Sequence, residues 1–324
     1  MKSLIPHLNP AQQSATAFAC SNIALCKYWG KRDSKLNLPI NSSLSISLAD
    51  KGATATIKLI SAAQDQYAIN NKSIATDCAH FLRLKNYFDL FRVTGFSFEV
   101  EINLNIPLAA GLASSAAIFA AIVKALDKLF AWQLDNKSLS ILARLGSGSA
   151  ARSIEEGFVE WHCGERDDGF DSFAEKIDSS WSDLRIGLCL LSTETKKISS
   201  RAGMQNTVET SILYQAWPQQ VAHDLPLIKQ AIHNHDFELL GKTAENNALA
   251  MHATMLASQP PLLYSTPETI QLMQKIWRLR SEGLKIYFTQ DAGPNLKLLF
   301  LKSELAQVQE YFANIEIVVP FKGN

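Results

Sequence analysis

The sequence predicts an α+β protein, because strand-like segments are concentrated early in the chain and long helical segments follow later. Residues 99–106 alternate between apolar and polar side chains, which is typical of a strand with one buried face. Residues 114–130 are rich in small apolar residues, and residues 220–257 are mostly helical in pattern. No stretch approaches the roughly 18 consecutive apolar residues that a membrane-spanning helix needs.

The remaining elements follow in chain order. β-Branched or alternating residues predict early strands, and a second short helix is expected after the helix at 114–130. Later apolar runs predict strands on both sides of the long helical region. The expected strands are residues 44–48, 54–60, 99–106, 157–161, 185–191, 285–290 and 315–321.

Length and composition indicate two modest domains. The chain has 324 residues, of which 47% are apolar and 19% charged, an ordinary composition for a protein with a sizeable core. We expect the seam between residues 185 and 200, so the predicted domains are residues 1–190 and 191–324.

The charge balance argues against a nucleic-acid or membrane surface. There are 31 basic and 31 acidic residues and no basic run, so any anionic ligand needs a few local cations. The five cysteines are scattered and form no Cys-x-x-Cys pair. This pattern favours reduced thiols in a cytoplasmic protein.

The most informative segment is Pro-Leu-Ala-Ala-Gly-Leu-Ala-Ser-Ser-Ala at residues 107–116. Its small residues allow close approach of a bulky anion, and Ser114 and Ser115 stand where a helix begins. Their hydroxyls can bind phosphate oxygens, and a serine hydroxyl can also reach Mg²⁺. The spacing differs from the common P-loop. The structural alternative is a tight turn with a serine cap before a buried helix.

This segment resembles the ATP-binding loop of the GHMP kinases, and three further segments narrow the resemblance to the mevalonate diphosphate decarboxylases. They are residues 22–33 with 38–43, residues 146–153 with 157–161, and Asp-Ala-Gly-Pro-Asn at 291–295. All four segments come in the family's order and span nearly the whole chain. Ala151 and Leu145 depart from residues common in the family, but neither carries obvious chemistry.

The resemblance implies a GHMP-kinase-like fold of two subdomains, with the active site in the cleft between them. It also implies ATP and Mg²⁺ as cofactors, a small-molecule substrate and a homodimer. The residues implied to contact the nucleotide are Ala110, Gly111, Leu112, Ala113, Ser114 and Ser115, with Ser114 also at the metal. The residues implied to bind the substrate are Asn22, Tyr28, Lys31, Ser147, Ser149, Arg152, Arg201 and Met204.

Three residues carry the implied chemistry, in which ATP phosphorylates a tertiary hydroxyl before phosphate and carbon dioxide leave. Asp291 would lie beside the 3-hydroxyl, Arg152 would hold the carboxylate, and Lys27 would lie near the phosphoryl path. The planar fork of an arginine suits a carboxylate, although a structural salt bridge is the alternative for Arg152. For Asp291 the alternative is a turn residue.

Other functions stay open at this point. The chain could act on mevalonate itself or on a monophosphate, because sequence alone does not count phosphates. A plain kinase is disfavoured, since the middle segment lacks the aspartate that related kinases place there. A non-catalytic phosphate-binding protein would be expected to lose Asp291 or the serines, and both are present.

Overall fold

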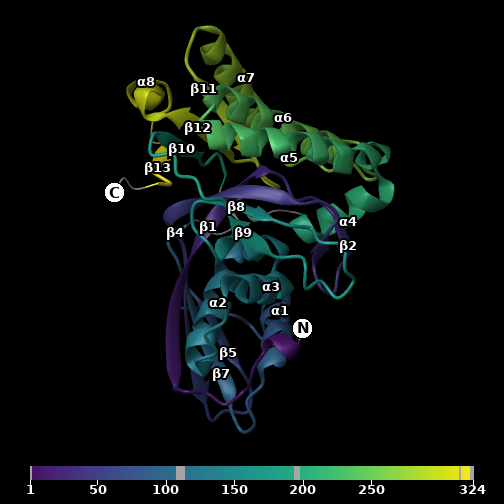
Figure 1. The fold of residues 1–324 in the computed structure, drawn as a ribbon, viewed down its shortest axis with the longest axis vertical. Helices are drawn as coiled ribbons and strands as arrows, with labels where there is room; N and C mark the ends of the chain where they lie inside the picture. The colour runs from purple at the N-terminus through teal and green to yellow at the C-terminus, as the bar shows by residue number, and fades with distance from the viewer. Residues whose placement is uncertain (1, 107–113, 193–197, 314, 322–324) are drawn as a thin grey trace.

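A computed structural model describes residues 2–106, 114–192, 198–313 and 315–321, and its two halves each contain a sheet covered by helices (Figure 1). Within these residues the larger sheet has the order β6-β5-β7-β4-β8-β9, with β1 paired antiparallel to β4. The strands of this sheet are β1 (Ser14–Cys26), β4 (Ser43–Ile60), β5 (Gln66–Ile69), β6 (Lys72–Ser73), β7 (Ser97–Leu104), β8 (Phe158–Trp161) and β9 (Ala174–Lys176). A small hairpin pairs β2 (Lys31–Asp33) with β3 (Leu38–Pro39).

The helices of the first half cover one face of this sheet, and α2 packs directly against β1 and β4. Its buried alanines let the helix lie close to the sheet, while its larger apolar residues fill the core. The helical elements here are η1 (Lys2–Leu4), α1 (Ala79–Phe88), η2 (Asp89–Phe91), α2 (Ser114–Phe130), α3 (Asn136–Gly146) and η3 (Gly148–Ser153).

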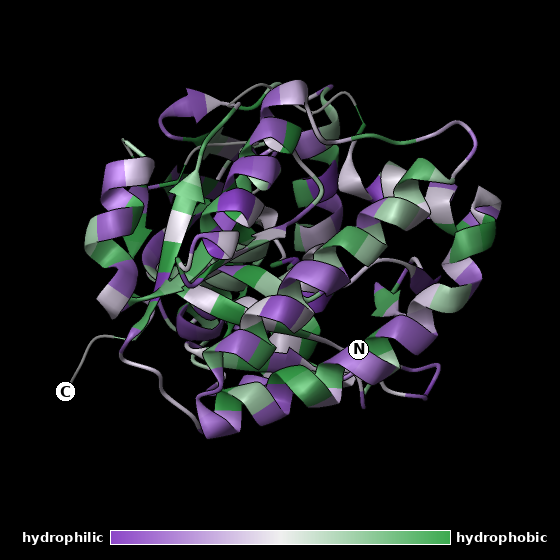
Figure 2. Cartoon of the chain, turned by 90° about the horizontal axis from the view of Figure 1, so that it is seen from above, coloured by the Kyte–Doolittle hydropathy of each residue, from purple (hydrophilic) through white to green (hydrophobic). Residues whose placement is uncertain are grey.

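The second half is built on the sheet β11-β12-β10-β13, against which α6 and α7 pack. Figure 2 shows polar and apolar residues alternating along the helices, as expected of helices that bury one face. None of the described helices is long and apolar enough to cross a membrane. The elements are β10 (Leu184–Cys189), α4 (Ser200–Thr210), η4 (Ile212–Ala216), α5 (Trp217–Asn234), α6 (Phe237–Leu256), α7 (Pro267–Ser281), β11 (Ile286–Gln290), β12 (Leu296–Leu301), η5 (Lys302–Glu304), α8 (Leu305–Tyr311) and β13 (Glu316–Val318).

Strands β1 and β4 run through both hydrophobic cores. The first part of β1 alternates between exposed and buried residues, and its buried alanines belong to the core under α2. The second part is buried on both faces, because α5 and α6 of the second half cover it. There, Ile23 and Leu25 belong to the core that the second half shares. The two halves are therefore joined by common strands as well as by contacts between their surfaces.

The predicted α+β class is confirmed, and the helix predicted at 114–130 has the observed bounds of α2. The strands predicted at 44–48 and 54–60 are one continuous strand, β4, because its neighbour β1 pairs with both parts. Strand β1 and helices α1 and α7 were not predicted. The buried residues of β1 are mostly small, which weakens its signal. The buried residues of α1 and α7 recur at helical spacing, so the sequence carried a signal for both helices that was missed. The domain division at residue 190 stays a prediction.

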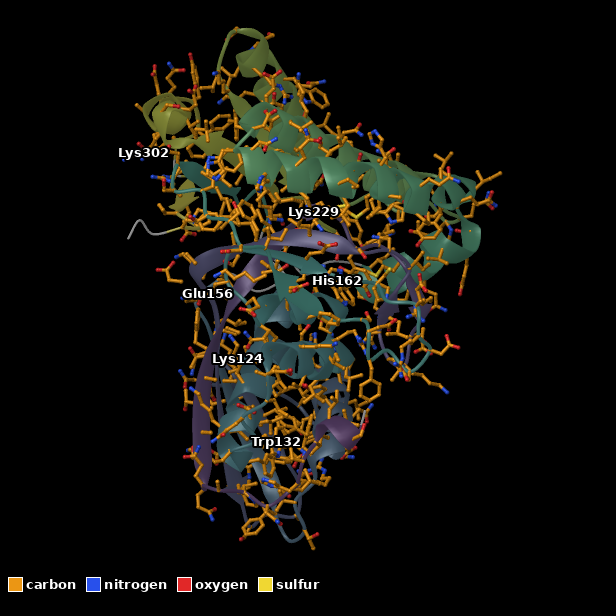
Figure 3. All side chains as sticks on the ribbon, viewed as in Figure 1. Lys124, Trp132, Glu156, His162, Lys229 and Lys302 are labelled. Atoms are coloured by element: carbon orange, nitrogen blue, oxygen red, sulfur yellow. The ribbon has the colours of Figure 1, made fainter. Side chains whose placement is uncertain are left out.

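Polar contacts also tie the halves together beside the shared strands. Tyr214 in η4 donates a hydrogen bond of 2.8 Å to the backbone oxygen of Trp29. Lys229 on α5 pairs with Glu160 on β8 at 2.6 Å, and His162 lies 3.6 Å from the same carboxylate. Lys229 and His162 are labelled at this seam in Figure 3. These contacts hold the segment after β1 and strand β8 against the helical elements of the second half.

A substitution at Gly30 would test how closely the two halves pack at this seam. Its φ of +108° is unfavourable for other residues, and a Cβ there would lie 1.8 Å from the hydroxyl oxygen of Tyr214. Gly283 has the same φ but faces open space, so Gly283→Ala is the matched control. We expect Gly283→Ala to cost about 1–2 kcal/mol of unfolding free energy and Gly30→Ala about 1–3 kcal/mol more. Urea denaturation measures both, and equal losses would contradict close packing of Tyr214 on Gly30.

Candidate active site

One cavity of about 460 Å³ gathers the predicted site residues from both halves of the chain. It lies where β1, α2, α3 and β11 end or begin, next to the start of α4. The predicted residues that line it are Asn22, Lys27, Tyr28, Lys31, Ser114, Ser115, Ser147, Ser149, Arg152, Arg201, Met204 and Asp291. The predicted nucleotide contacts Ala110, Gly111, Leu112 and Ala113 lie outside the described residues.

Asp291 stands immediately after β11 and is held between two ammonium groups. Its Oδ1 accepts a hydrogen bond of 2.8 Å from Lys27, and its Oδ2 lies 3.3 Å from Nζ of Lys297. Both lysine side chains are 1% exposed, whereas that of Asp291 is 22% exposed and faces the cavity. Burial alone would raise the pKa of Asp291, but the two ammonium groups outweigh it and hold the pKa below its usual range. The carboxylate is therefore ionised at neutral pH.

Lys27 directly follows β1, and hydrogen bonds to residues of both halves fix its position. Its ammonium also donates to the backbone oxygen of Ala24 at 2.7 Å. Its backbone N–H donates to Asn247 on α6, whose amide in turn donates to Asp224 on α5. Burial lowers the pKa of Lys27 to about 8, and Asp291 opposes that shift. The ammonium is thus charged at neutral pH.

Arg152 in η3 presents a buried guanidinium to the cavity. It donates to the hydroxyl of Ser43 at 2.5 Å and to the side-chain oxygen of Asn22 at 3.4 Å. Its Nε has no hydrogen-bond partner among the described residues. Burial lowers the pKa of Arg152 to about 10, while Asp291 opposes the shift, so the group keeps its charge. A buried cation with an unused donor is suited to an incoming anion.

Hydroxyl groups line the wall between α2 and η3. Ser115 lies 3.2 Å from Ser147, and Ser147 lies 3.5 Å from Ser149, measured between hydroxyl oxygens. Ser114 is the first residue of α2, where free backbone N–H groups and the helix dipole favour phosphate. The Tyr28 hydroxyl is buried without a partner among the described atoms. These donors face the same space as the cations.

A second group of cations lies at the outer end of the cavity. Lys31 on β2, Arg83 on α1 and Arg201 on α4 all line it. Burial and, to a lesser extent, repulsion by Arg201 and Arg83 together lower the pKa of Lys31 to about 8. Burial and Arg201 likewise lower the pKa of Arg83 to about 10. In the described part of the chain Lys31 has no carboxylate partner, so its charge is available to an anionic ligand.

The charges around the cavity are strongly unbalanced. Its described lining contains one carboxylate, that of Asp291, against the five Lys and Arg side chains Lys27, Lys31, Arg83, Arg152 and Arg201. The described residues contain no cluster of three His, Cys, Asp or Glu side chains that would hold a metal. A magnesium ion here would therefore need oxygens from a bound phosphate, and the Ser114 hydroxyl is the predicted protein ligand. The cavity suits a polyanion that brings its own metal.

Comparison with known proteins places the chain in a family. Residues 19–174 match the diphosphomevalonate decarboxylase-like N-terminal domain, and residues 186–319 match the mevalonate 5-diphosphate decarboxylase C-terminal domain. The chain is 37% identical over 313 residues to diphosphomevalonate decarboxylase mvd1 of Aspergillus fumigatus, covering 90% of this chain and 77% of that protein. The chain belongs to the diphosphomevalonate decarboxylase family.

Solved structures agree with this membership. The mevalonate diphosphate decarboxylase of Staphylococcus aureus is 37% identical, with a TM-score of 0.89 over 96% of this chain and 97% of that chain. A structure described as MDDEF in complex with MVAPP, AMPPCP and magnesium is 36% identical, with a TM-score of 0.86 over 95% of this chain and 96% of that chain. The GHMP-kinase-like fold expected from the resemblance is therefore confirmed.

Sequence reasoning missed several residues around this decarboxylase cavity. Lys297 lies on β12, two residues beyond the 291–295 segment, and its charge within an apolar strand was the available signal. Arg83 lies on α1, a helix that was not predicted. His252 on α6 lies 3.2 Å from the backbone oxygen of Asp291, and its pKa is lowered to about 4, chiefly by burial. A neutral imidazole there donates to that oxygen and fixes the turn.

Replacing Lys297 tests the two-cation arrangement. The lowered pKa of Asp291 contributes stability above the unfolded pKa of about 4, and this contribution is lost as the pH falls through the folded pKa. Lys297→Met should raise the folded pKa of Asp291 and cost about 2 kcal/mol at pH 7. The stability gap to the wild type should narrow as the pH falls toward about 3.

Chemical denaturation at several pH values measures this gap. The control is Lys302→Met, at an exposed lysine that does not line the cavity and that Figure 3 labels on the second half. A gap that stays constant with pH would show that Lys297 acts by packing alone.

Proposed function

We propose that this cavity carries out the ATP-dependent decarboxylation of mevalonate 5-diphosphate, the reaction of the family to which the chain belongs. The supporting observation is the excess of cations, of which Lys27 and Arg152 are buried, around a single ionised aspartate. The reacting pair brings a diphosphate, a carboxylate and a triphosphate into one site. The five cations of the lining offset part of that charge, and the hydroxyl groups at the start of α2 add hydrogen-bond donors.

The nucleotide belongs at the start of α2. Ser114 and Ser115 offer hydroxyls there, beside the free N–H groups of the helix. ATP and Mg²⁺ are the cofactors of the family, and the ion neutralises phosphate charge during transfer. Ser114 would contribute its hydroxyl to the ion, and residues 110–113, which lie outside the described residues, stay predicted nucleotide contacts.

Asp291 is proposed to interact with the 3-hydroxyl of the substrate. Its ionised oxygen accepts a hydrogen bond from this hydroxyl, directs the substrate oxygen toward the γ-phosphate, and takes up the hydroxyl proton as the new O–P bond forms. The low pKa makes this carboxylate a weak base. A weak base is adequate because a loose phosphoryl-transfer transition state has little bonding to the attacking oxygen. Lys27 donates a hydrogen bond to the same carboxylate and keeps Asp291 ionised. It is proposed to lie near the phosphoryl group that is transferred.

Arg152 is proposed to orient the substrate carboxylate, with Asn22 beside it. After phosphorylation the C3–O bond breaks, phosphate leaves, and positive charge develops at C3. The electron pair of the bond to the carboxylate then forms the alkene as carbon dioxide departs. A guanidinium whose fork is partly engaged by Ser43 aligns this group while retaining other donors for it.

The diphosphate is proposed to lie at the outer cations, remote from the reacting carbon. Lys31 and Arg201 supply charge, Tyr28, Ser147 and Ser149 supply hydroxyls, and Met204 packs alongside. Gly148 is needed here, because a Cβ at this position would lie 2.8 Å from the Tyr28 hydroxyl oxygen. Such contacts anchor the substrate so that the carboxylate and hydroxyl reach their partners.

We further propose a cytoplasmic homodimer with domains at residues 1–190 and 191–324. The support for the dimer is the family resemblance, together with exposed apolar side chains on the second half such as Ile212 and Leu263. The support for the cytoplasm is that the five cysteines are free. The seam falls near β10, where the chain passes from the larger sheet to the smaller one.

Substrate comparison tests the proposed reaction directly. With magnesium and ATP, mevalonate 5-diphosphate should yield one ADP, one phosphate and one carbon dioxide per turnover. The 5-monophosphate should have at least tenfold lower kcat/KM, since it forfeits charged hydrogen bonds at the outer cations. Coupled ADP and carbon dioxide assays measure both products. ADP without carbon dioxide would indicate a kinase, and equal efficiency on both substrates would remove the diphosphate assignment.

Asp291→Asn tests the role of the carboxylate. The change keeps the size but removes the charge that accepts the hydroxyl hydrogen, so we expect kcat to fall roughly 10³-fold. Mevalonate 5-diphosphate should still bind with nearly unchanged affinity. ADP and carbon dioxide should fall together, because phosphorylation precedes elimination. Rapid-quench kinetics and calorimetric binding measure the two effects, and near-normal turnover would assign the hydroxyl to another residue.

A further inference from the structure

We propose that Asn37 is a positioning residue that directs the ammonium group of Lys31 toward the substrate diphosphate. This inference rests on the proposed function, and it concerns a residue outside the predicted site. Asn37 lies between β2 and β3 at the border of the cavity, and it is only 2% exposed. Nζ of Lys31 donates a 2.6 Å hydrogen bond to its side-chain oxygen.

The orientation of the Asn37 amide is fixed from its other end. Its Nδ2 donates to the backbone oxygens of Arg144 and Leu145, both at 2.9 Å. These carbonyls belong to the last turn of α3, where helix carbonyls lack intrahelical partners. Because carbonyl oxygens only accept, the NH₂ group must face them and the amide oxygen must face Lys31. The end of α3 thereby determines where Lys31 points.

The backbone at Asn37 is compatible with this role. Its φ is 52°, in the left-handed region that asparagine tolerates better than most residues. The hairpin before it is closed by Asp33, whose side chain accepts a hydrogen bond of 2.7 Å from the N–H of Leu36. The short connection from Lys31 brings Asn37 back beside it, so a local turn supplies the acceptor.

A neutral acceptor has a particular advantage at this place. Lys31 faces Arg201 and Arg83, and its pKa is lowered by burial and by these cations. A carboxylate in place of Asn37 would also hold Lys31, but it would cancel the charge intended for the diphosphate. The amide restrains the ammonium without neutralising it. The cations at this end of the cavity therefore keep their full attraction for an anion.

A double-mutant cycle between Asn37 and Lys31 tests the inference. Asn37→Gly removes the amide and accepts the positive φ, and Lys31→Ala removes the ammonium. The matched control is Asn71→Gly, because Asn71 has a φ of 61° but lies exposed at the β5–β6 turn. Calorimetry would measure the Kd of mevalonate 5-diphosphate and of inorganic diphosphate for each variant, and steady-state assays would give kcat and the KM for ATP.

We expect Asn37→Gly to weaken mevalonate 5-diphosphate binding about tenfold, the effect of one misdirected charged hydrogen bond. The kcat and the KM for ATP should change less than about twofold, and Asn71→Gly should resemble the wild type. In the Lys31→Ala background, Asn37→Gly should have no further effect on binding. A general loosening of the fold would instead persist in that background.

Additive losses, or equal changes in kcat and in the KM for ATP, would overturn the role of Asn37. Unchanged diphosphate binding in Asn37→Gly would overturn it as well. Failure of the proposed function is recognised separately, because the wild type would then release no carbon dioxide from mevalonate 5-diphosphate. In that case coupling between Asn37 and Lys31 for inorganic diphosphate would still support the positioning role, and its absence would refute it.

Discussion

The ion pair between Lys27 and Asp291 is the contact around which the cavity is arranged. It joins the end of β1 in the first half to the end of β11 in the second half, with N···O at 2.8 Å. Burying these charges together with Lys297 carries a desolvation cost that ion pairing seldom exceeds by much. Such an arrangement is a weak explanation of stability. It is a good explanation of a carboxylate that stays ionised while facing a polyanionic ligand.

Much of the site could be predicted because short segments of the sequence are specific. The motifs around Ser114, Arg152 and Asp291 fall at element ends, where they turn toward one space. The residues that hold these catalytic and binding groups in position could not be predicted. Asn37 and Lys297 act through partners that the fold supplies. No local pattern marks an acceptor for Lys31, and a lysine within an apolar strand does not by itself show that its partner is Asp291. Roles of this kind depend on distances between segments.

The fold was predictable to a similar extent and for similar reasons. Helix α2 has a long, uniform apolar pattern, so its bounds follow from the sequence. Strand β1 changes character along its length, from alternating to fully buried, because a different layer covers each part. A window of a few residues contains no information about a covering layer that comes from residues 217–256. Tertiary packing determines such a strand more than its own periodicity does.

The wide separation of Lys27 and Asp291 along the chain has a consequence for the order of assembly. Strands β1, β4 and β7 and helix α2 lie within the first 130 residues, so their contacts can form while the rest of the chain is still being synthesised. The ion pair spans 264 positions, and closing so long a loop is slow compared with local pairing. A nascent chain can therefore form the local contacts of α2 with its strands well before it can form the catalytic ion pair.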